Sequence, residues 1–133
     1  MDEVLDPAMQ VRRAVLGAEY VDRAVANASA FTAPFQTFVT RYAWGECWLD
    51  DTLDRRTRSL LTLSIMTVLG QRDEIRLHVR GALTNGCTPD EIAATLKNVA
   101  VYAGVAAAVA AVNIANEELV ASGLQSVPEE VAK

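Results

Sequence analysis

Helical signals separated by glycine and proline extend along most of this chain, and they constrain its fold more than any other feature. Apolar residues recur at helical spacing in segments that begin at a capping residue or end at a glycine. The clearest signal is Thr88-Pro89-Asp90-Glu91, in which Thr88 can cap a helix and Glu91 can bind back to the Thr88 amide. The expected helices cover residues 7–16, 21–27, 34–44, 55–69, 72–84, 89–103 and 105–122.

This pattern predicts an all-α protein, a compact bundle of six to seven helices joined by short loops. A length of 133 residues suits one domain rather than two. We therefore expect a single domain over 1–133, with its core at about 10–122 and a loose tail at 124–133. The helix over 55–69 is apolar on most sides and should be buried, and with the alanine-rich helix over 105–122 it indicates a homo-oligomer.

Charge and cysteine content exclude several classes of protein. A net charge of −5 argues against binding to nucleic acid or to an anionic membrane. No apolar run approaches the roughly 18 residues of a membrane span, and the acidic start MDEVLD is unlike a signal peptide. Cys47 and Cys87 form no CxxC motif and no metal-ligand spacing. We expect a cytoplasmic protein with reduced thiols and with neither a metal nor a cofactor.

The single histidine, His78, lies four residues after Glu74 on the same face of an expected helix. A carboxylate in this position can fix the imidazole tautomer and favour its protonated form, which suits a proton donor. Ordinary surface pairs have the same spacing, so the pattern alone leaves both interpretations open. Arg72, Arg76 and Arg80 lie about 200° away around the helix, where solvent or another subunit is the expected neighbour.

Ten of the twelve basic residues are arginine, whose planar fork fits carboxylates. Arg55, Arg56 and Arg58 are concentrated at the start of an expected helix, where their charges oppose the helix dipole. They could bind an anion, or the aspartates of segment 50–54 could neutralise them. The sequence favours neither interpretation.

Residues 41–48 combine both tryptophans with a cation, a carboxylate and a thiol. Trp44, between Arg41 and Glu46, would suit the wall of a binding pocket, although such aromatic residues more often fill a core. The two cysteines are expected to be buried apolar groups rather than nucleophiles. Since no glycine-rich phosphate loop, serine elbow or metal motif is present, an enzymatic reaction would have to use side chains alone.

Several ordered blocks resemble the carboxymuconolactone decarboxylase family over about residues 10–120. The blocks are RRAVLG with YVDRA, then RYAWGE, LDRRTRSLLTL, HVRGALTNG and VYAGV. The resemblance implies an all-helical, AhpD-like fold (the alkylhydroperoxidase fold) that assembles into rings, often hexamers. Alkylhydroperoxidase-like proteins use a CxxC motif followed by histidine. Gln71 and Glu74 stand at those positions here, which argues against thiol peroxidase chemistry.

The resemblance also implies a reaction, the loss of CO₂ from 4-carboxymuconolactone to give the β-ketoadipate enol-lactone in protocatechuate degradation. The lactone carbonyl can accept the electron pair as an extended enolate, so the chemistry requires neither a metal nor a cofactor. What the protein must supply is a cationic clamp for the carboxylate, a stabiliser for the developing oxyanion and a proton donor.

Six residues are candidates for these roles. They are His78 as general acid, Glu74 or Glu46 as the residue that orients it, Arg58 and Arg41 as clamps, and Trp44 as pocket wall. The chain departs from the usual family pattern at residues 50–52, Asn98, Ala106 and Val109. Two alternatives therefore stay open, another lactone or β-keto acid as substrate, or a non-catalytic oligomeric binding protein. The expected partners are a small lactone carboxylate and further copies of the chain, as a trimer or hexamer.

Overall fold

The structure is a computed structural model that describes residues 5–124, and within that range it is all-helical, as predicted. The helices are α1 (Leu5–Leu16), α2 (Ala18–Ala26), α3 (Ala33–Val39), the π-helix η1 (Thr40–Trp48), α4 (Arg55–Leu69), α5 (Arg72–Thr84), α6 (Pro89–Ala103) and α7 (Val105–Ala121). The tail expected at 124–133 lies outside the described residues from position 125 onward.

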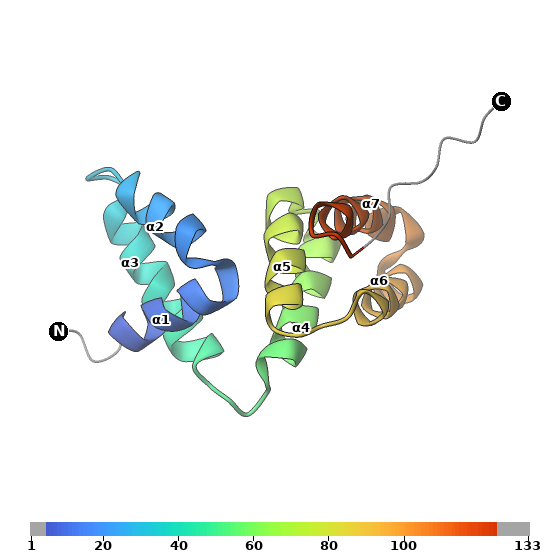
Figure 1. The fold of residues 1–133 in the computed structure, drawn as a ribbon, viewed down its shortest axis with the longest axis horizontal. Helices are drawn as coiled ribbons and strands as arrows, with labels where there is room; N and C mark the ends of the chain where they lie inside the picture. Colours follow the sequence, from blue (N-terminus) through green and yellow to red (C-terminus); the bar gives the residue numbers. More distant parts are fainter. Residues whose placement is uncertain (1–4, 125–133) are drawn as a thin grey trace.

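Two groups of helices lie side by side (Figure 1). One contains α1, α2, α3 and η1, and the other contains α4 to α7. Residues 49–54 connect them, and α1 packs on α5 across the junction. Gly81 permits this approach, because a Cβ at that position would lie 3.3 Å from Val15 Cγ1. The α1–α5 contact brings the two groups together beside His78.

The core has two parts that correspond to these groups. The larger part, within α4–α7, is centred on Leu63, Ile75 and Ile92, which are almost fully buried. Two alanines of α7, Ala111 and Ala115, are buried in it against the neighbouring helices. The smaller part joins the inner face of α1 to Trp44 and Trp48 of η1.

Local capping explains where several helices begin and end. Asp54 accepts a hydrogen bond from the Thr57 amide at 2.7 Å and so starts α4. Gly70 ends it in the left-handed conformation, with φ 69°. The capping box between Thr88 and Glu91 is formed as predicted at the start of α6. The boundaries expected for these helices and for α5 are therefore confirmed.

The break expected at Gly45 is wrong. Helical structure continues through Gly45 to Trp48 as η1, and Leu49 N donates to Trp44 O, five residues earlier, at 3.0 Å. A glycine inside a helix costs only about 1 kcal/mol, and two buried tryptophans outweigh that cost. The wider π-helical turn aligns Thr40, Trp44 and Trp48, which are the buried residues of η1.

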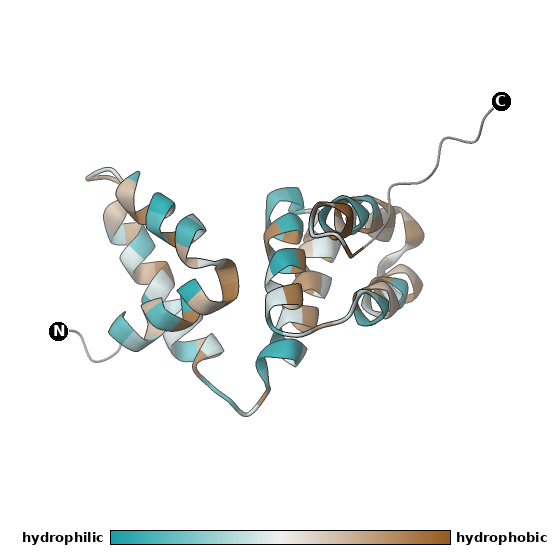
Figure 2. Ribbon diagram, viewed as in Figure 1, coloured by the Kyte–Doolittle hydropathy of each residue, from teal (hydrophilic) through white to brown (hydrophobic). Residues whose placement is uncertain are grey.

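Complete burial of the helix over 55–69 is also wrong for the single chain. Leu63 of α4 is fully buried, but Leu61, Ile65, Val68 and Leu69 are each about half exposed. The reason is geometric, because α5, α6 and α7 cover α4 only in part. Hydrophobic positions recur along α4–α7 (Figure 2). None of the helices within residues 5–124 is long and apolar enough to cross a membrane.

Candidate active site

His78 lies on the buried side of α5, in the contact between the two groups of helices. Its side chain is only 8% exposed. The Trp48 indole stacks on the imidazole, with 6.4 Å between the ring centroids and 11° between the planes. The ring is thus held within the protein instead of turning freely in solvent.

Glu74, one turn earlier on α5, is the carboxylate beside His78. Its Oε2 lies 3.5 Å from His78 Nε2, and its side chain is half exposed. The hydrogen bond with His78 holds the pKa of Glu74 below its ordinary value, although partial burial opposes the shift. The opposite ring nitrogen, Nδ1, is buried and has no hydrogen-bond partner within residues 5–124. Nε2 is therefore the ring nitrogen that has a polar neighbour, the half-exposed Glu74.

Trp48 is supported from behind by Trp44. The two indoles stack with centroids 5.0 Å apart, and both side chains are buried against the inner face of α1. Trp44 is thus a core residue that backs Trp48, and Trp48 is the ring that reaches His78. Sequence reasoning selected Trp44 and missed Trp48. The spacing of four residues was a usable signal, since it places both on one face of a helix.

Arg58, on the first turn of α4, approaches the same end of η1. Its Nη1 donates to Cys47 Sγ at 3.2 Å, while Nε and Nη2 donate to the Asp50 carbonyl at 3.2 and 2.8 Å. The Asp50 carboxylate lies 3.8 Å away, and the Arg58 side chain is 13% exposed. Arg58 and His78 therefore contact consecutive residues of η1, Cys47 and Trp48.

Two candidates lie on the outer side of η1. Arg41 and Glu46 are both exposed. Of the two carboxylates considered for His78, only Glu74 lies within ion-pair distance among residues 5–124.

Cys47 is exposed, contrary to the expectation of burial, because it faces away from the tryptophan core, whereas Cys87 is buried as expected.

Two arginines of α5, Arg76 and Arg80, are neutralised by α7. Arg76 and Arg80 of α5 bind the buried Glu118 of α7, at 2.7 Å each, and Arg76 also binds Glu117 at 2.6 Å. The expectation of solvent or another subunit beside Arg76 and Arg80 is corrected, since α7 packs against that side of α5.

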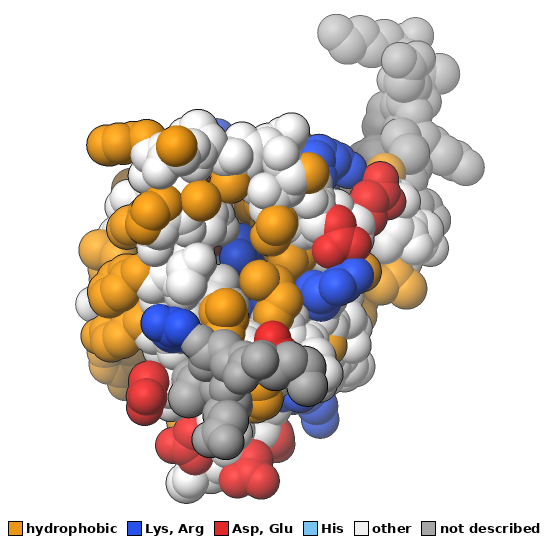
Figure 3. Space-filling view, turned by 90° about the vertical axis from the view of Figure 1, so that its left-hand side faces the viewer, with side chains coloured by type: hydrophobic (Ala, Val, Ile, Leu, Met, Phe, Trp, Pro, Cys, Tyr) orange, Lys and Arg blue, Asp and Glu red, His pale blue; other side chains and the backbone are white. Residues whose placement is uncertain are grey.

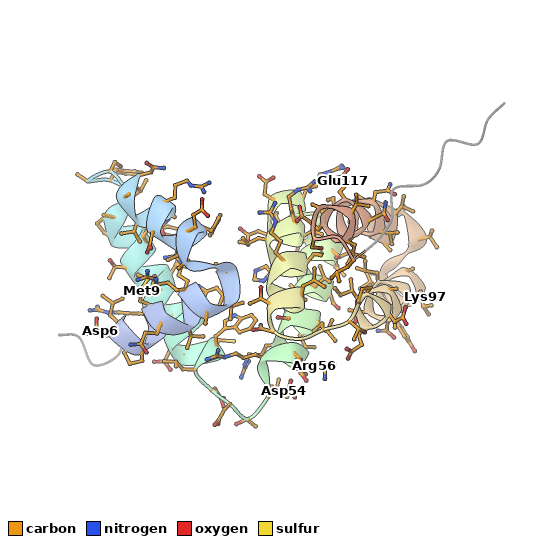
Figure 4. All side chains as sticks on the ribbon, viewed as in Figure 1. Asp6, Met9, Asp54, Arg56, Lys97 and Glu117 are labelled. Carbon is orange, nitrogen blue, oxygen red and sulfur yellow. The ribbon has the colours of Figure 1, made fainter. Side chains whose placement is uncertain are left out.

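At the start of α4, labelled at Asp54 and Arg56 in Figure 4, Arg56 pairs with Glu91 of α6. Asp54 caps α4 by accepting a hydrogen bond from the Thr57 amide, and Asp50 lies beside Arg58. Arg56 is therefore neutralised by Glu91. Arg58 has Asp50 as an acidic neighbour and also contacts η1.

Asn98 and Val109, at which the sequence departs from the usual family pattern, line grooves away from His78. Val109 belongs to an apolar groove of about 390 Å³ between α6 and α7, and Asn98 to one of about 400 Å³ between α4 and α6. His78 lines neither groove. Residues 5–124 also bring together no group of three side chains suited to hold a metal ion.

The sequence is similar to those of known proteins. The sequence profile of the carboxymuconolactone decarboxylase family matches residues 33–117, which include η1 and His78. The chain is 41% identical over 125 residues to the 4-carboxymuconolactone decarboxylase of Acinetobacter baylyi, covering 94% of this chain and 92% of that protein. The chain belongs to the carboxymuconolactone decarboxylase family.

Two further relatives show the range of this family. The nitrosuccinic acid decarboxylase of Metarhizium robertsii is 41% identical over 118 residues, covering 87% of this chain and 81% of that protein. A 4-carboxymuconolactone decarboxylase of Pseudomonas putida is 49% identical over 41 residues, covering 31% of this chain and 85% of that protein. This family member is a decarboxylase, that is, a carboxy-lyase.

Proposed function

We propose that this family member decarboxylates 4-carboxymuconolactone to the β-ketoadipate enol-lactone without a cofactor, in protocatechuate degradation. The observation that carries the proposal is the His78 ring, buried against Trp48, with the Glu74 carboxylate 3.5 Å from Nε2. The near-complete alignment with a relative named for this reaction supports the choice of substrate.

Arg58 is the proposed clamp for a substrate carboxylate. Within residues 5–124, three of its N–H groups donate to Cys47 and to the Asp50 carbonyl. A guanidinium has five donors, so two remain for an anion. Its contacts fix the plane of the fork, which reduces the entropy lost on binding. Arg41, which lies on the π-helix η1 together with Cys47, is the second proposed clamp.

The proposed reaction moves one electron pair and one proton. The bond from the lactone ring to the departing carboxylate breaks, CO₂ leaves, and the electron pair enters the conjugated system that ends at the lactone carbonyl. His78 then donates the Nε2 proton to a carbon of this extended enolate. Glu74 stabilises the protonated ring and fixes its orientation. Because Nδ1 is enclosed, Nε2 is the atom assigned to proton donation.

A second candidate substrate class is a different activated carboxylic acid. The equal identity to a relative named nitrosuccinic acid decarboxylase supports this alternative. In both reactions an electron-withdrawing group can accept the electron pair, either directly from the neighbouring carbon or through a conjugated double bond. The clamp and the proton donor would keep their roles, and only the pocket for the acceptor group would differ.

We also propose that the enzyme acts in the cytoplasm as a homo-oligomer, a trimer or a hexamer. Apolar side chains remain exposed on α4, among them Ile65, and the segment around α3 and η1 exposes aromatic residues. These are Phe31, Phe35, Phe38 and Tyr42. Hydrophobic side chains also gather along one edge of the face in Figure 3. Exposed apolar surface on this scale favours subunit contacts.

The direct test is to mix the purified enzyme with 4-carboxymuconolactone and follow CO₂ release together with the lactone absorbance. We expect catalytic turnover with stoichiometric CO₂. Nitrosuccinate is the parallel substrate. Turnover of nitrosuccinate alone would replace the first substrate by the second, and turnover of neither by the folded protein would reject the proposed function.

A further inference from the structure

Arg12 is a buried cation that has no counter-ion among residues 5–124. It lies on the inner face of α1 and is only 6% exposed. Its Nη1 donates to Thr40 Oγ1 at 3.0 Å and its Nη2 to Gln36 Oε1 at 2.8 Å. Both acceptors are neutral. Among residues 5–124 no carboxylate forms an ion pair with Arg12, and its buried Nε has no hydrogen-bond partner.

An uncompensated buried charge is unfavourable, because a low-dielectric environment disfavours the charged form. The effect is visible at Arg12, where burial lowers the pKa of the guanidinium, slightly opposed by the nearby Tyr20. The other arginines whose pKa shifts are resolved show the opposite shift, since carboxylates face Arg56, Arg76 and Arg80. Among the described arginines whose pKa shifts are resolved, Arg12 is thus the one whose surroundings lack a carboxylate.

A cavity of about 130 Å³ opens beside the Arg12 side chain, between α1, α2 and α3. Its polar lining consists of Arg12, Gln36, Thr37 and Thr40. The rest of the lining is apolar and contains Leu5, Met9, Val25, Ala28 and Ala33, of which Met9 is labelled in Figure 4. Among residues 5–124, none that lines the cavity is acidic. The cavity therefore combines one cationic end with an apolar wall, on a scale that suits a few heavy atoms.

We propose that Arg12, Gln36 and Thr40 form a second anion site, which binds a small monocarboxylate with a short apolar chain. The carboxylate supplies the missing counter-charge beside the Arg12 guanidinium, and the alkyl chain lies along the wall at Met9 and Ala28. This site shares no residue with the one proposed for decarboxylation. It lies at the other end of η1, since Thr40 begins that helix and Trp48 ends it.

Propionate is the probe for this site, because it has one carboxylate and a two-carbon chain. We expect it to raise the Tm of the full-length protein in a saturable way at constant ionic strength. We also expect a change in fluorescence from the two tryptophans, both of which lie on η1. Propionamide has the same shape without the charge and should have no effect. Sulfate distinguishes a carboxylate site from general anion binding and should give no saturable rise.

Arg12→Met removes the charge and keeps an unbranched apolar side chain. We expect it to weaken propionate binding by at least about tenfold, which corresponds to about 1.4 kcal/mol. Arg23→Met is the matched control, because Arg23 is exposed and pairs only with Glu19 among residues 5–124. It should respond to propionate as the unmodified protein does.

A second variant keeps the proposal testable if Arg12→Met does not fold. Ala28→Leu narrows the cavity without touching the guanidinium and should likewise weaken the response to propionate. The proposal is overturned by any of three results. They are no saturable response in the unmodified protein, an equal response to propionamide or sulfate, and an undiminished response in the folded Arg12→Met and Ala28→Leu variants.

Discussion

The Trp48 indole lies nearly parallel to the His78 imidazole, with 11° between the two ring planes. The two residues come from different groups of helices, η1 and α5. The stacking therefore fixes the orientation of the histidine ring and joins the two parts of the core. Trp44, stacked behind at 5.0 Å, limits the movement of Trp48 in turn.

Replacing Trp48 should have two effects that can be measured separately, one on kcat and one on the free energy of unfolding. Trp48→Leu removes the flat surface that holds His78, and small displacements of a catalytic group can lower kcat by up to about 10²-fold. It should also reduce the free energy of unfolding by about 3 kcal/mol, as for other large-to-small core substitutions. Steady-state kinetics and urea unfolding measure the two effects.

The controls for this substitution are Trp48→Phe and Trp44→Phe. Trp48→Phe keeps a flat ring and should retain most of the activity. Trp44→Phe should lower stability with less change in kcat, because Trp44 does not stack on His78. Equal kcat values for Trp48→Leu and the unmodified enzyme would remove Trp48 from the site.

Glu74→Gln should lower kcat by about tenfold or more, a barrier increase of about 1.4 kcal/mol, because the amide cannot stabilise a protonated imidazole. The pKa of Glu74 lies below its ordinary value of 4.5 because of the hydrogen bond with His78. The Glu74 carboxylate is therefore ionised above that value and gains a proton as the pH falls through the lowered pKa. The unmodified enzyme should show this acid limb in kcat, and Glu74→Gln should lack it.

Asp73→Asn is the matched control for Glu74→Gln, since Asp73 is the neighbouring exposed carboxylate on α5. It should change neither kcat nor the pH profile. If both substitutions had the same effect, the change would reflect the net charge of α5, and the pairing of Glu74 with His78 would have no catalytic part.

Arg58→Lys keeps the charge but loses the fork, so the KM for a carboxylate substrate should rise by about tenfold. Arg72→Lys, at an exposed position on α5, should leave the KM unchanged. Because Arg58 also holds the Asp50 carbonyl, the Tm of both variants must be measured. An unchanged KM for Arg58→Lys would contradict the clamp.

Much of the fold could be predicted from the sequence, because its signals are local. Capping by Asp54 and Thr88 and the stop at Gly70 lie within a few residues of the helix ends that they determine. The π-helical turn through Gly45 could not be predicted, since it depends on burying Trp44 and Trp48 against α1, more than 25 residues away in sequence. Tertiary packing outweighed the local preference of glycine.

The candidate site was predictable in part for the same reason. The approach of Glu74 to His78 follows from a spacing of four residues on one helix. The spacing of Trp44 and Trp48 places both on one helix face, but the contacts of Trp48 with His78 and of Arg12 with Thr40 join helices that are distant in sequence and could not be predicted. Likewise, the pairing of Arg76 and Arg80 with Glu118 spans about 40 residues, and no local pattern indicates it.

Glu118→Gln should make stability less dependent on acid pH. Burial would raise the pKa of Glu118, but hydrogen bonds from Arg80 and Arg76 outweigh it and hold the pKa below the ordinary value of 4.5. The stabilisation is therefore complete above 4.5 and is lost as the pH falls through the lowered pKa. Urea unfolding between neutral and acid pH should give a shallower slope for the variant, and identical slopes would contradict the assignment.

The most direct measurement is the kcat for 4-carboxymuconolactone of the unmodified enzyme and of His78→Gln, prepared and assayed in parallel. A general acid contributes about 10²–10⁴-fold to the rate, so kcat should fall by that factor while circular dichroism and subunit mass stay unchanged. A His78→Gln protein that folds and turns over at the unmodified rate would contradict the central role of the buried imidazole.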